Sequence, residues 1–364
     1  MKNIIIAQQP ASPRDWAKLL VYDTSTDEIF FDRFYNLDKY LPKKSFLVFN
    51  NTKVLPARIR LKKKNGGVVE VLFLVNETNR SDKKIRGMVD RKINIGDKLF
   101  FDNKNLATAV RQENNIFTFK LNFTREKLFR LLENAGSMPI PPYIKNTPLT
   151  EQELRKKYQT IFSGTPVGAR LIGSMAAPTA SLHFTDRVFK KLEKKGIKKF
   201  FITLHVGLGT FAPVSEKNIK EKKLHQEYFE MEKETLKNCQ RWKKNGKKLV
   251  AVGTTVVRTL ESIFLYPPEF ISGSCQKCYN QFSEIISKNK KIFGNTRIFI
   301  FPPYNFKAVD CLITNFHLPG SSLRLLVEAF LKFKKAKKTL EELYQIAIDN
   351  HCRFYSFGDA MLIK

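Results

Sequence analysis

Short apolar runs separated by turn residues dominate the chain from Ser45 to about Phe123. These runs are rich in Val, Phe and Ile, and they read FLVFN, GGVVEVLFLV, KIRGMVD, DKLFFD, ATAV and NIFTFKL. Between them stand residues typical of turns, namely Asn65-Gly66-Gly67, Ile95-Gly96-Asp97 and Glu113-Asn114-Asn115. Strands of this length and spacing predict a small barrel or sandwich.

A helix is predicted directly after this β-rich block, over Arg125–Gly136. Three leucines share one face of it at helical spacing, and the closing glycine is a helix stop signal. The proline-rich segment PIPPYIK (Pro139–Lys145) follows. Because proline disfavours both helix interiors and central strands, we interpret this segment as a crossing between two domains.

From Thr185 onward the pattern changes to apolar strands that alternate with amphipathic helices. The predicted helices are Thr185–Lys195, Glu232–Lys244, TVVRTLESIF, SSLRLLVEAFLKF and LEELYQIAIDNH, and the predicted strands are KKFFITLHV, KLVAVG, IFIF and CLITNF. Such alternation predicts an α/β sheet with helices packed against it. The Lys-rich stretch Phe270–Asn295 interrupts the alternation and is interpreted as a surface insertion.

The charge balance points to a polyanionic partner. The chain has 64 Lys and Arg against 34 Asp and Glu, a formal net charge of +30. Clustered basic residues gain affinity for phosphates by releasing counterions. The alternative is the codon bias of an AT-rich genome, but such bias alone would be expected to add Glu along with Lys. A nucleic acid partner is therefore favoured.

The remaining composition indicates a reduced, globular protein. A hydrophobic fraction of 43% argues against wholesale disorder. The apolar run near the start is too short for a signal peptide, and no run is long enough for a membrane helix. Five cysteines in the last third do not form a disulfide framework. We expect the protein to be cytoplasmic.

Four of the five histidines lie in segments of small residues, glycine, proline and hydroxyls. These segments are Met175–Phe184, Leu204–Phe211, Leu224–Phe229 and Thr314–Ser322. Glycine permits turns that other residues resist, and the hydroxyls offer local hydrogen bonds. Because such segments commonly form ligand-binding loops on a rigid scaffold, an enzyme is the first hypothesis.

Several of these residues could transfer protons. His205 ends an apolar strand just before a glycine turn, where α/β sheets bind ligands. His225 and Glu227 are two apart in an extended segment, so both are expected to face the same side. They could form an acid–base pair or only a surface hydrogen bond. His183 and His317 follow bulky apolar residues and could equally be buried core imidazoles.

The segment GTTVVRTLE could bind an anion. Thr254 and Thr255 stand at the start of a predicted helix, whose free backbone N–H groups can hold a carboxylate or phosphate, and Arg258 follows about one turn later. The alternative is an ordinary helix cap. Other cofactor motifs are weak, since the Gly207–Gly209 pair lacks the third glycine of a dinucleotide fingerprint. Cys275 and Cys278 alone supply only two of the four ligands of a zinc site, so no metal is expected.

Taken together, these motifs resemble one family, the S-adenosylmethionine:tRNA ribosyltransferase-isomerases of the queuosine pathway. The matching segments keep their order and span almost the whole chain. They are IIIAQQPASPRDWAKLLVYD, LVFNNTKVLPARI, GGVVEVLFL, PPYI, YQTIF, AAPTASLHF, TLHVGLGTFAPV, HQEY, VAVGTTVVRTLES, YNFKAVDCLITNFHLP and RFYSFGDAMLI.

The resemblance implies an unusual use of S-adenosylmethionine. The family transfers and isomerises its ribosyl group onto the aminomethyl group of 7-aminomethyl-7-deazaguanine in tRNA, which gives epoxyqueuosine-tRNA and releases adenine and methionine. S-adenosyl-L-methionine is thus the ribosyl donor, and tRNA bearing the precursor at the wobble position is the partner. We expect a monomer. Two rival hypotheses are a divergent relative acting on another nucleoside or sulfonium substrate and a non-catalytic tRNA-binding protein.

Site residues follow from the same resemblance and from the positions above. The catalytic candidates are His205, His183, Glu227 and His225. The substrate-binding candidates are Thr179, Gly207, Gly209, Thr210, Thr254, Thr255, Arg258, Asn315, His317 and Asp359. The candidates for tRNA binding are Arg14, Lys53 and Arg58.

The resemblance also implies a fold. A larger α/β domain is expected from both chain ends, residues 1–58 and 140–364, with a small antiparallel β-barrel domain inserted at 59–139. The chain departs from the family pattern at a few positions. Asn51-Thr52-Lys53 replaces Asp-Thr-Arg, Ser181 and Pro303 replace glycines, and Gln226 replaces serine. Extra residues occur at 164–173 and 264–295.

Overall fold

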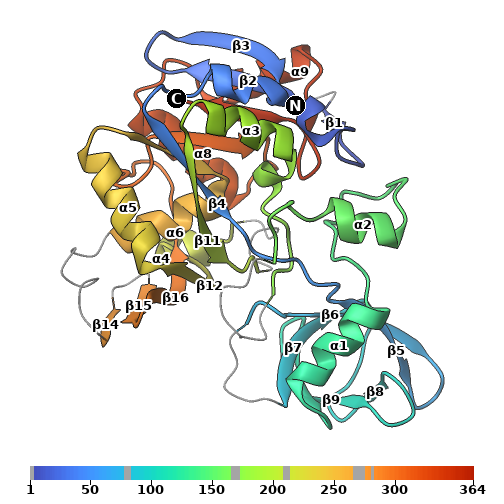
Figure 1. Ribbon diagram of the computed structural model, residues 1–364. Helices are drawn as coiled ribbons and strands as arrows, with labels where there is room; N and C mark the ends of the chain where they lie inside the picture. The colour runs from blue at the N-terminus through green and yellow to red at the C-terminus, as the bar shows by residue number, and fades with distance from the viewer. Residues whose placement is uncertain (1–3, 78–82, 165–172, 208–213, 265–274, 280–282) are drawn as a thin grey trace.

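The chain folds into two lobes, a larger α/β domain and a closed β-barrel (Figure 1). The structure is a computed structural model, and it describes residues 4–77, 83–164, 173–207, 214–264, 275–279 and 283–364. The barrel is inserted between two strands of the α/β domain, and segments from both sides of the insertion build one sheet. This confirms the fold class expected from the sequence.

An eleven-stranded mixed sheet forms the framework of the larger domain. Its strands lie in the order β14 (Cys275–Tyr279), β15 (Ser283–Lys288), β16 (Lys291–Ile298), β12 (Lys223–Glu232), β11 (Lys198–Leu204), β4 (Ser45–Asn50), β13 (Lys248–Val252), β17 (Cys311–Asn315), β19 (Ala360–Ile363), β2 (Lys18–Asp23) and β3 (Glu28–Arg33). The four strands β11, β4, β13 and β17 are mutually parallel. Their carboxyl ends therefore meet at one edge of the sheet.

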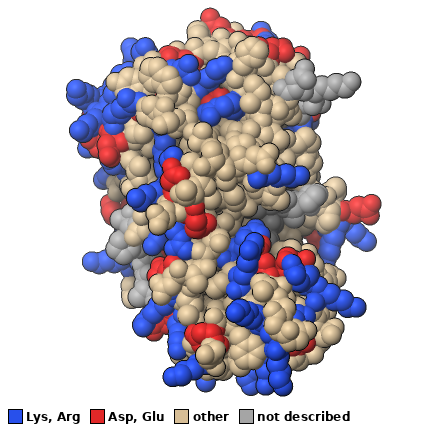
Figure 2. Space-filling model, turned by 90° about the vertical axis from the view of Figure 1, so that its right-hand side faces the viewer, with Lys and Arg blue, Asp and Glu red and all other residues tan. Residues whose placement is uncertain are grey.

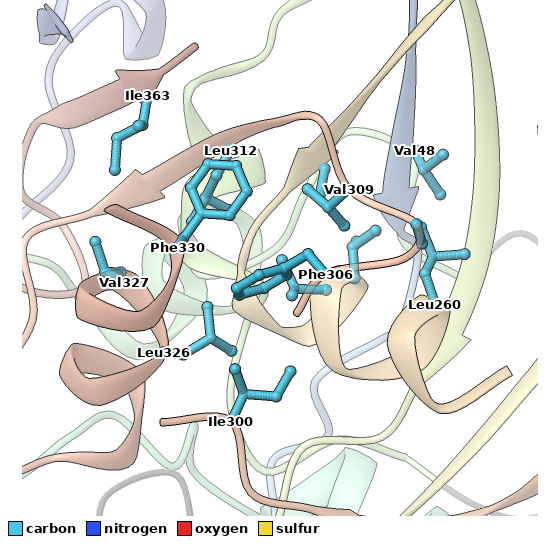
Figure 3. Close-up of a cluster of buried hydrophobic side chains, with 14 of the residues drawn as sticks. Val48, Leu260, Ile300, Phe306, Val309, Leu312, Leu326, Val327, Phe330 and Ile363 are labelled. Atoms are coloured by element: carbon cyan, nitrogen blue, oxygen red, sulfur yellow. The ribbon is translucent and has the colours of Figure 1, made fainter. Parts of the chain in front are cut away.

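The central strands of this sheet are buried on both faces. Successive residues of a strand point to opposite sides, so each strand contributes to two hydrophobic clusters. Val48 of β4 joins one cluster with Leu260 of α6 (Thr254–Phe264) and Phe330 of α8 (Ser322–Phe333), as Figure 3 shows. The next residue, Phe49, joins the cluster on the other face. Each such side chain contributes about 2 kcal/mol on burial, so the strand ends rest on a rigid base.

Five helices of the domain begin at hydroxyl caps, namely α2 (Glu151–Lys157), α3 (Asp186–Lys194), α4 (Glu216–Glu221), α8 and α9 (Leu340–Asp349). Thr185 accepts a hydrogen bond from the Val188 N–H at the start of α3, as its sequence predicts. The further helices and short elements are α5 (Lys233–Lys244), η1 (Arg14–Trp16), η2 (Phe34–Lys39), η3 (Thr179–His183) and the paired strands β1 (Ile5–Ile6) and β18 (Arg353–Phe354).

The smaller lobe is a closed six-stranded antiparallel barrel with its own core. Its strands lie in the order β10 (Ile116–Leu121), β7 (Lys84–Val89), β6 (Val68–Phe73), β5 (Arg58–Lys63), β8 (Lys98–Phe100) and β9 (Leu106–Glu113). Helix α1 (Arg125–Ala135), capped by Thr124, packs against it and ends before Gly136. Closure leaves no edge strand exposed, which suits a small inserted unit.

Two expectations about the late sequence are wrong. The run IFIF is not a strand beyond its first residue, since β16 ends at Ile298. The Lys-rich stretch expected as a surface insertion instead supplies β14, β15 and most of β16, which extend the sheet beyond β12. Its lysines obscured an alternating apolar pattern, in which Ile285 and Ile292 enter the main core.

None of the helices in the described part of the chain has both the length and the hydrophobicity of a membrane span.

Candidate active site

Polar residues stand at the carboxyl ends of the four parallel strands, the edge at which α/β sheets bind ligands. Asn50 ends β4, His205 follows β11, Thr254 lies just beyond β13, and Asn315 ends β17. These residues are far apart in sequence. The sheet topology therefore assembles them, and the strand ends hold them at defined positions.

A small cavity of about 70 Å³ opens at this edge. Its walls combine small residues with hydroxyls and include five of the predicted substrate-binding residues, Thr179, Thr254, Thr255, Asn315 and His317. The sequence thus led to residues on three separate segments that line one cavity.

The first turn of α6 faces this cavity. Gly253 adopts φ +95°, a conformation that glycine tolerates best, and it turns the chain from β13 directly into the helix. Thr254 and Thr255 then line the cavity at the positive end of the helix dipole. Backbone N–H groups and hydroxyls at such an end are suited to a carboxylate or phosphate.

Asn50 ties three parts of this edge together and was missed by the sequence analysis. Its Oδ1 accepts hydrogen bonds from the N–H groups of Leu204 (3.0 Å) and Thr52 (3.1 Å). Its Nδ2 donates to the Leu204 carbonyl (3.0 Å) and to the Thr255 hydroxyl (3.2 Å). The fully buried amide therefore fixes the residue before His205, Thr52 and the cavity wall at once.

His205 is held from two sides. Its Nδ1 lies 2.8 Å from the Thr52 hydroxyl, and its ring lies parallel to that of Tyr228 at 6.0 Å. Burial lowers the pKa of His205 to about 4, so the imidazole is neutral at neutral pH. Val206 lines the cavity and Gly207 lines a second cleft described below, whereas His205, between Leu204 and Val206 in sequence, is not among the described residues that line either one.

His317 and His183 occupy different depths. His317 lines the cavity, and its Nε2 lies 2.7 Å from the Thr314 hydroxyl. His183 is buried behind the cavity against the Phe34 ring, and its Nε2 lies 3.4 Å from Nδ2 of Asn315. Burial lowers the pKa of both imidazoles to about 4. Each is therefore an uncharged group that can accept or donate one hydrogen bond per ring nitrogen.

Asp359 lies behind the same wall as Asn315. Its carbonyl accepts from Asn315 Nδ2 at 3.5 Å, while its carboxylate accepts from the N–H groups of Lys18 (3.0 Å) and Arg353 (2.8 Å) and from Arg353 Nη2 (2.9 Å). The carboxylate thus joins β2 to the segment before β19. Asp359, which was expected to bind substrate, is not among the described residues that line the cavity.

Glu227 and Arg258 form a buried ion pair. Glu227 Oε2 meets Arg258 Nη1, and its Oε1 accepts from the Gly207 N–H at 3.0 Å. The pair therefore binds the backbone two residues after His205. His225 is exposed, whereas Glu227 is buried in its ion pair with Arg258. The register of β12 against β16 shifts between Lys223 and Glu227, and this irregularity interrupts the regular alternation from which a shared face was expected.

The three residues expected to bind tRNA each have a partner within the protein. Arg14 donates to the carbonyls of Lys156 and Gln159, Lys53 lies 3.9 Å from a Glu133 oxygen, and Arg58 pairs with Glu70 at 2.7 Å. Gly209 and Thr210 lie outside the described residues. The side chains of Cys275 and Cys278 are not described either, and the described residues contain no group of His, Cys, Asp and Glu arranged to hold a metal.

An aromatic wall of the cavity was also missed. Tyr143 and Tyr355 line it with ring centroids 5.0 Å apart, and the Tyr143 hydroxyl lies 2.6 Å from the Ser356 hydroxyl. Tyr143 stands in the proline-rich crossing, so that segment contributes to the site. Aromatic faces of this kind suit a planar heterocycle or a cation.

Comparison with known proteins places this site in context. The family model of the queuosine biosynthesis protein matches residues 1–363. S-adenosylmethionine:tRNA ribosyltransferase-isomerases of Thermodesulfovibrio yellowstonii and Thermosipho melanesiensis are each 40% identical, over 359 and 364 residues, covering 99% of this chain and 96% of the relative. A crystal structure of S-adenosylmethionine tRNA ribosyltransferase from Thermotoga maritima superimposes with a TM-score of 0.51 at 29% identity, covering 99% of this chain and 96% of the other.

Proposed function

The chain belongs to the queuosine biosynthesis protein family, and from that premise we propose that it is a tRNA-modifying transferase and isomerase. It transfers and isomerises the ribosyl group of S-adenosylmethionine onto 7-aminomethyl-7-deazaguanine in tRNA. The products are epoxyqueuosine-tRNA, adenine and methionine. One observation carries this proposal beyond the relatives' names, namely that predicted residues from distant segments line one cavity at the carboxyl edge of the sheet.

The cavity suits the ribosyl donor in two respects. Thr254 and Thr255 at the start of α6 are suited to the methionine carboxylate. The aromatic rings of Tyr143 and Tyr355 on another part of the wall are suited to a sulfonium cation or to adenine. Thr179 and Asn315 supply further hydrogen bonds along the lining.

Proton transfer is assigned first to His205. The reaction begins with loss of a proton from the carbon beside the positive sulfur, so it needs a base that is unprotonated at neutral pH. The lowered pKa of His205 meets that need, and Thr52 holds the ring through Nδ1. His317, which lines the cavity, is a second candidate for hydrogen bonding to the departing adenine.

The remaining predicted residues act around these two imidazoles. Glu227 and Arg258 together hold Gly207 in place, and His183 holds Asn315 in the cavity wall. His225 lines the second cleft, outside the cavity. Its imidazole could exchange a proton with an RNA substrate bound in that cleft.

Adenine release provides the test. The purified chain is incubated with S-adenosylmethionine and tRNA bearing the deazaguanine precursor, and adenine is measured by chromatography. We expect release that depends on that tRNA, and a loss of 100-fold or more (about 10² to 10⁴ for a proton-transfer residue) in His205→Ala. The matched control is His351→Asn, at an exposed helix end with φ +54°, which asparagine tolerates.

Three results would redirect the proposal. Near-normal turnover of His205→Ala would remove His205 as the base. Adenine release without the tRNA would favour a divergent enzyme. Tight tRNA binding without any turnover would favour a binding protein.

A further inference from the structure

A second, more polar cleft lies between the barrel and the α/β domain. Its volume is about 530 Å³. One wall comes from the barrel side and includes Asn76 and Arg86, and the other comes from α4, β12 and β16. Gly207 and Tyr228 also line it. The cleft is therefore continuous with the segment that carries His205.

The charged side chains of the cleft favour an anion. Four are basic, Arg86, Lys217, Lys223 and Arg297, and two are acidic, Glu77 and Glu221. The acidic groups are matched, since Glu77 lies 3.4 Å from Arg86 and Glu221 lies 3.8 Å from Lys217. Arg297 donates to the neutral amide of Gln226 at 2.9 Å. The cleft thus keeps an excess of two positive charges.

The outer surface of the barrel is also basic. Figure 2 shows Lys and Arg side chains gathered over the lower lobe, which is the barrel. A charged strand that crosses the gap would meet basic groups on both domains, because Arg86 belongs to the barrel strand β7 and Lys217 to α4. Basic groups on two facing walls can follow a phosphate backbone along its length.

The barrel also touches the main chain of the site. A Cβ added to Gly207 would lie 2.6 Å from Nδ2 of Asn76, so a larger residue there would have to displace the Asn76 side chain. Val206, one residue earlier, lines the first cavity. A nucleotide bound at the base of the cleft would therefore contact Gly207, which follows the cavity-lining Val206 directly and His205 by two residues.

From these observations we propose that this cleft binds a single-stranded RNA segment through its phosphates and directs one nucleotide toward His205. The inference rests on the proposed function, which requires a tRNA base to reach the cavity. A base inside a duplex cannot reach a buried site, whereas a loop nucleotide can turn out of its stack. The cleft therefore binds loop RNA in preference to duplex.

Charge removal on the α/β wall tests this directly. Lys223 and Arg297 carry the two unmatched positive charges of the cleft and are half-buried and exposed respectively, so Lys223→Gln/Arg297→Gln should fold normally. The matched control is Lys190→Gln/Lys194→Gln, which removes two exposed lysines from α3, at the end of the molecule away from the barrel (Figure 1). Arg86→Gln tests the barrel wall separately. Circular dichroism and thermal unfolding verify that each variant is folded.

Binding is measured by fluorescence anisotropy at several salt concentrations, with an anticodon stem-loop RNA and with a duplex of the same stem. Two lost phosphate contacts should weaken stem-loop binding about tenfold and lower the salt slope by about 1.4, because single strands contribute about 0.7 per contact. Arg86→Gln, which removes one contact, should lower the salt slope by about 0.7. The α3 control should match the wild type, and the duplex should bind more weakly than the stem-loop.

The outcomes separate this inference from the proposed function. Unchanged affinity and slope in the cleft variants, with normal tRNA-dependent adenine release, would overturn the cleft assignment alone. Weakened binding in those variants with no adenine release by the wild type would support the cleft and refute the reaction. An equal loss in the α3 control, or tighter binding of the duplex, would also overturn the inference.

Discussion

Replacing Asn50 by leucine tests whether one buried amide organises the candidate site. Leucine keeps the approximate size of asparagine but removes its donor and acceptor atoms. Four hydrogen bonds are lost, two to the Leu204 backbone, one to the Thr52 N–H and one to the Thr255 hydroxyl. All three partner residues are buried, so water cannot readily replace these bonds.

The loss of stability follows from that count. A buried hydrogen bond contributes about 1 kcal/mol net, and a buried group left without a partner costs about 1–3 kcal/mol. Four bonds therefore predict a loss of roughly 4 kcal/mol in the free energy of unfolding. Activity should fall further than stability explains, because Thr52 and the residue before His205 both lose their anchor.

Urea unfolding followed by circular dichroism measures the first quantity, and adenine release by the folded fraction measures the second. The control is Asn105→Leu in the barrel, where the amide donates to Asp102 at 2.6 Å. We expect the control to lose about 1–2 kcal/mol and to keep its kcat. A loss below about 1 kcal/mol in Asn50→Leu, or an unchanged kcat, would refute the reasoning.

Four further predictions concern single groups. Thr52→Val should lower kcat about tenfold with a stability loss near 1 kcal/mol, and Thr52→Ser should restore kcat. A normal kcat for the valine variant would show that the bond to His205 is dispensable. Glu261 accepts three backbone N–H bonds of residues 307–309, so Glu261→Gln should lower the unfolding free energy by about 2 kcal/mol, which urea unfolding measures. His183 has a folded-state pKa of about 4, below its ordinary 6.5, so the unfolded chain takes up its proton first as the pH falls. The contribution of His183 to stability should therefore be intact above pH 6.5 and fall by about 3 kcal/mol toward pH 4, so the total fall should be smaller by that amount in His183→Gln. Burial raises the pKa of the Cys239 thiol to about 12, so a thiol reagent should modify it only after unfolding. Rapid labelling of that cysteine in the native protein would contradict its burial.

Local signals predicted much of the fold. The caps Thr124 and Thr185 and the glycines after their helices mark boundaries through short-range hydrogen bonds, and the helices begin and end close to them. The barrel followed from short apolar runs with turn residues between them. The position of His205 at a strand end placed it at the edge where the cavity opens.

Features that depend on distant partners were not predictable. Asn50 ends a strand that is buried along its whole length, so nothing in the local sequence distinguishes it. Its importance follows from its hydrogen bonds to Leu204 and Thr255, which are distant in sequence. Tyr143 and Tyr355 meet across more than half of the chain. The register shift in β12 depends on its pairing with β16, so alternation within the segment could not reveal it. In β14–β16 the charged residues masked the alternation of a sheet extension.

The two chain segments that connect the barrel to the larger domain lie next to each other. Arg58 and Ser137 exchange backbone hydrogen bonds of 3.3 and 2.7 Å, so the ends of the inserted segment lie side by side. A short turn could join them, so the barrel could be excised without moving a strand of the larger sheet. Leu55 and Met175, which pack on the barrel core, would then need polar substitutes.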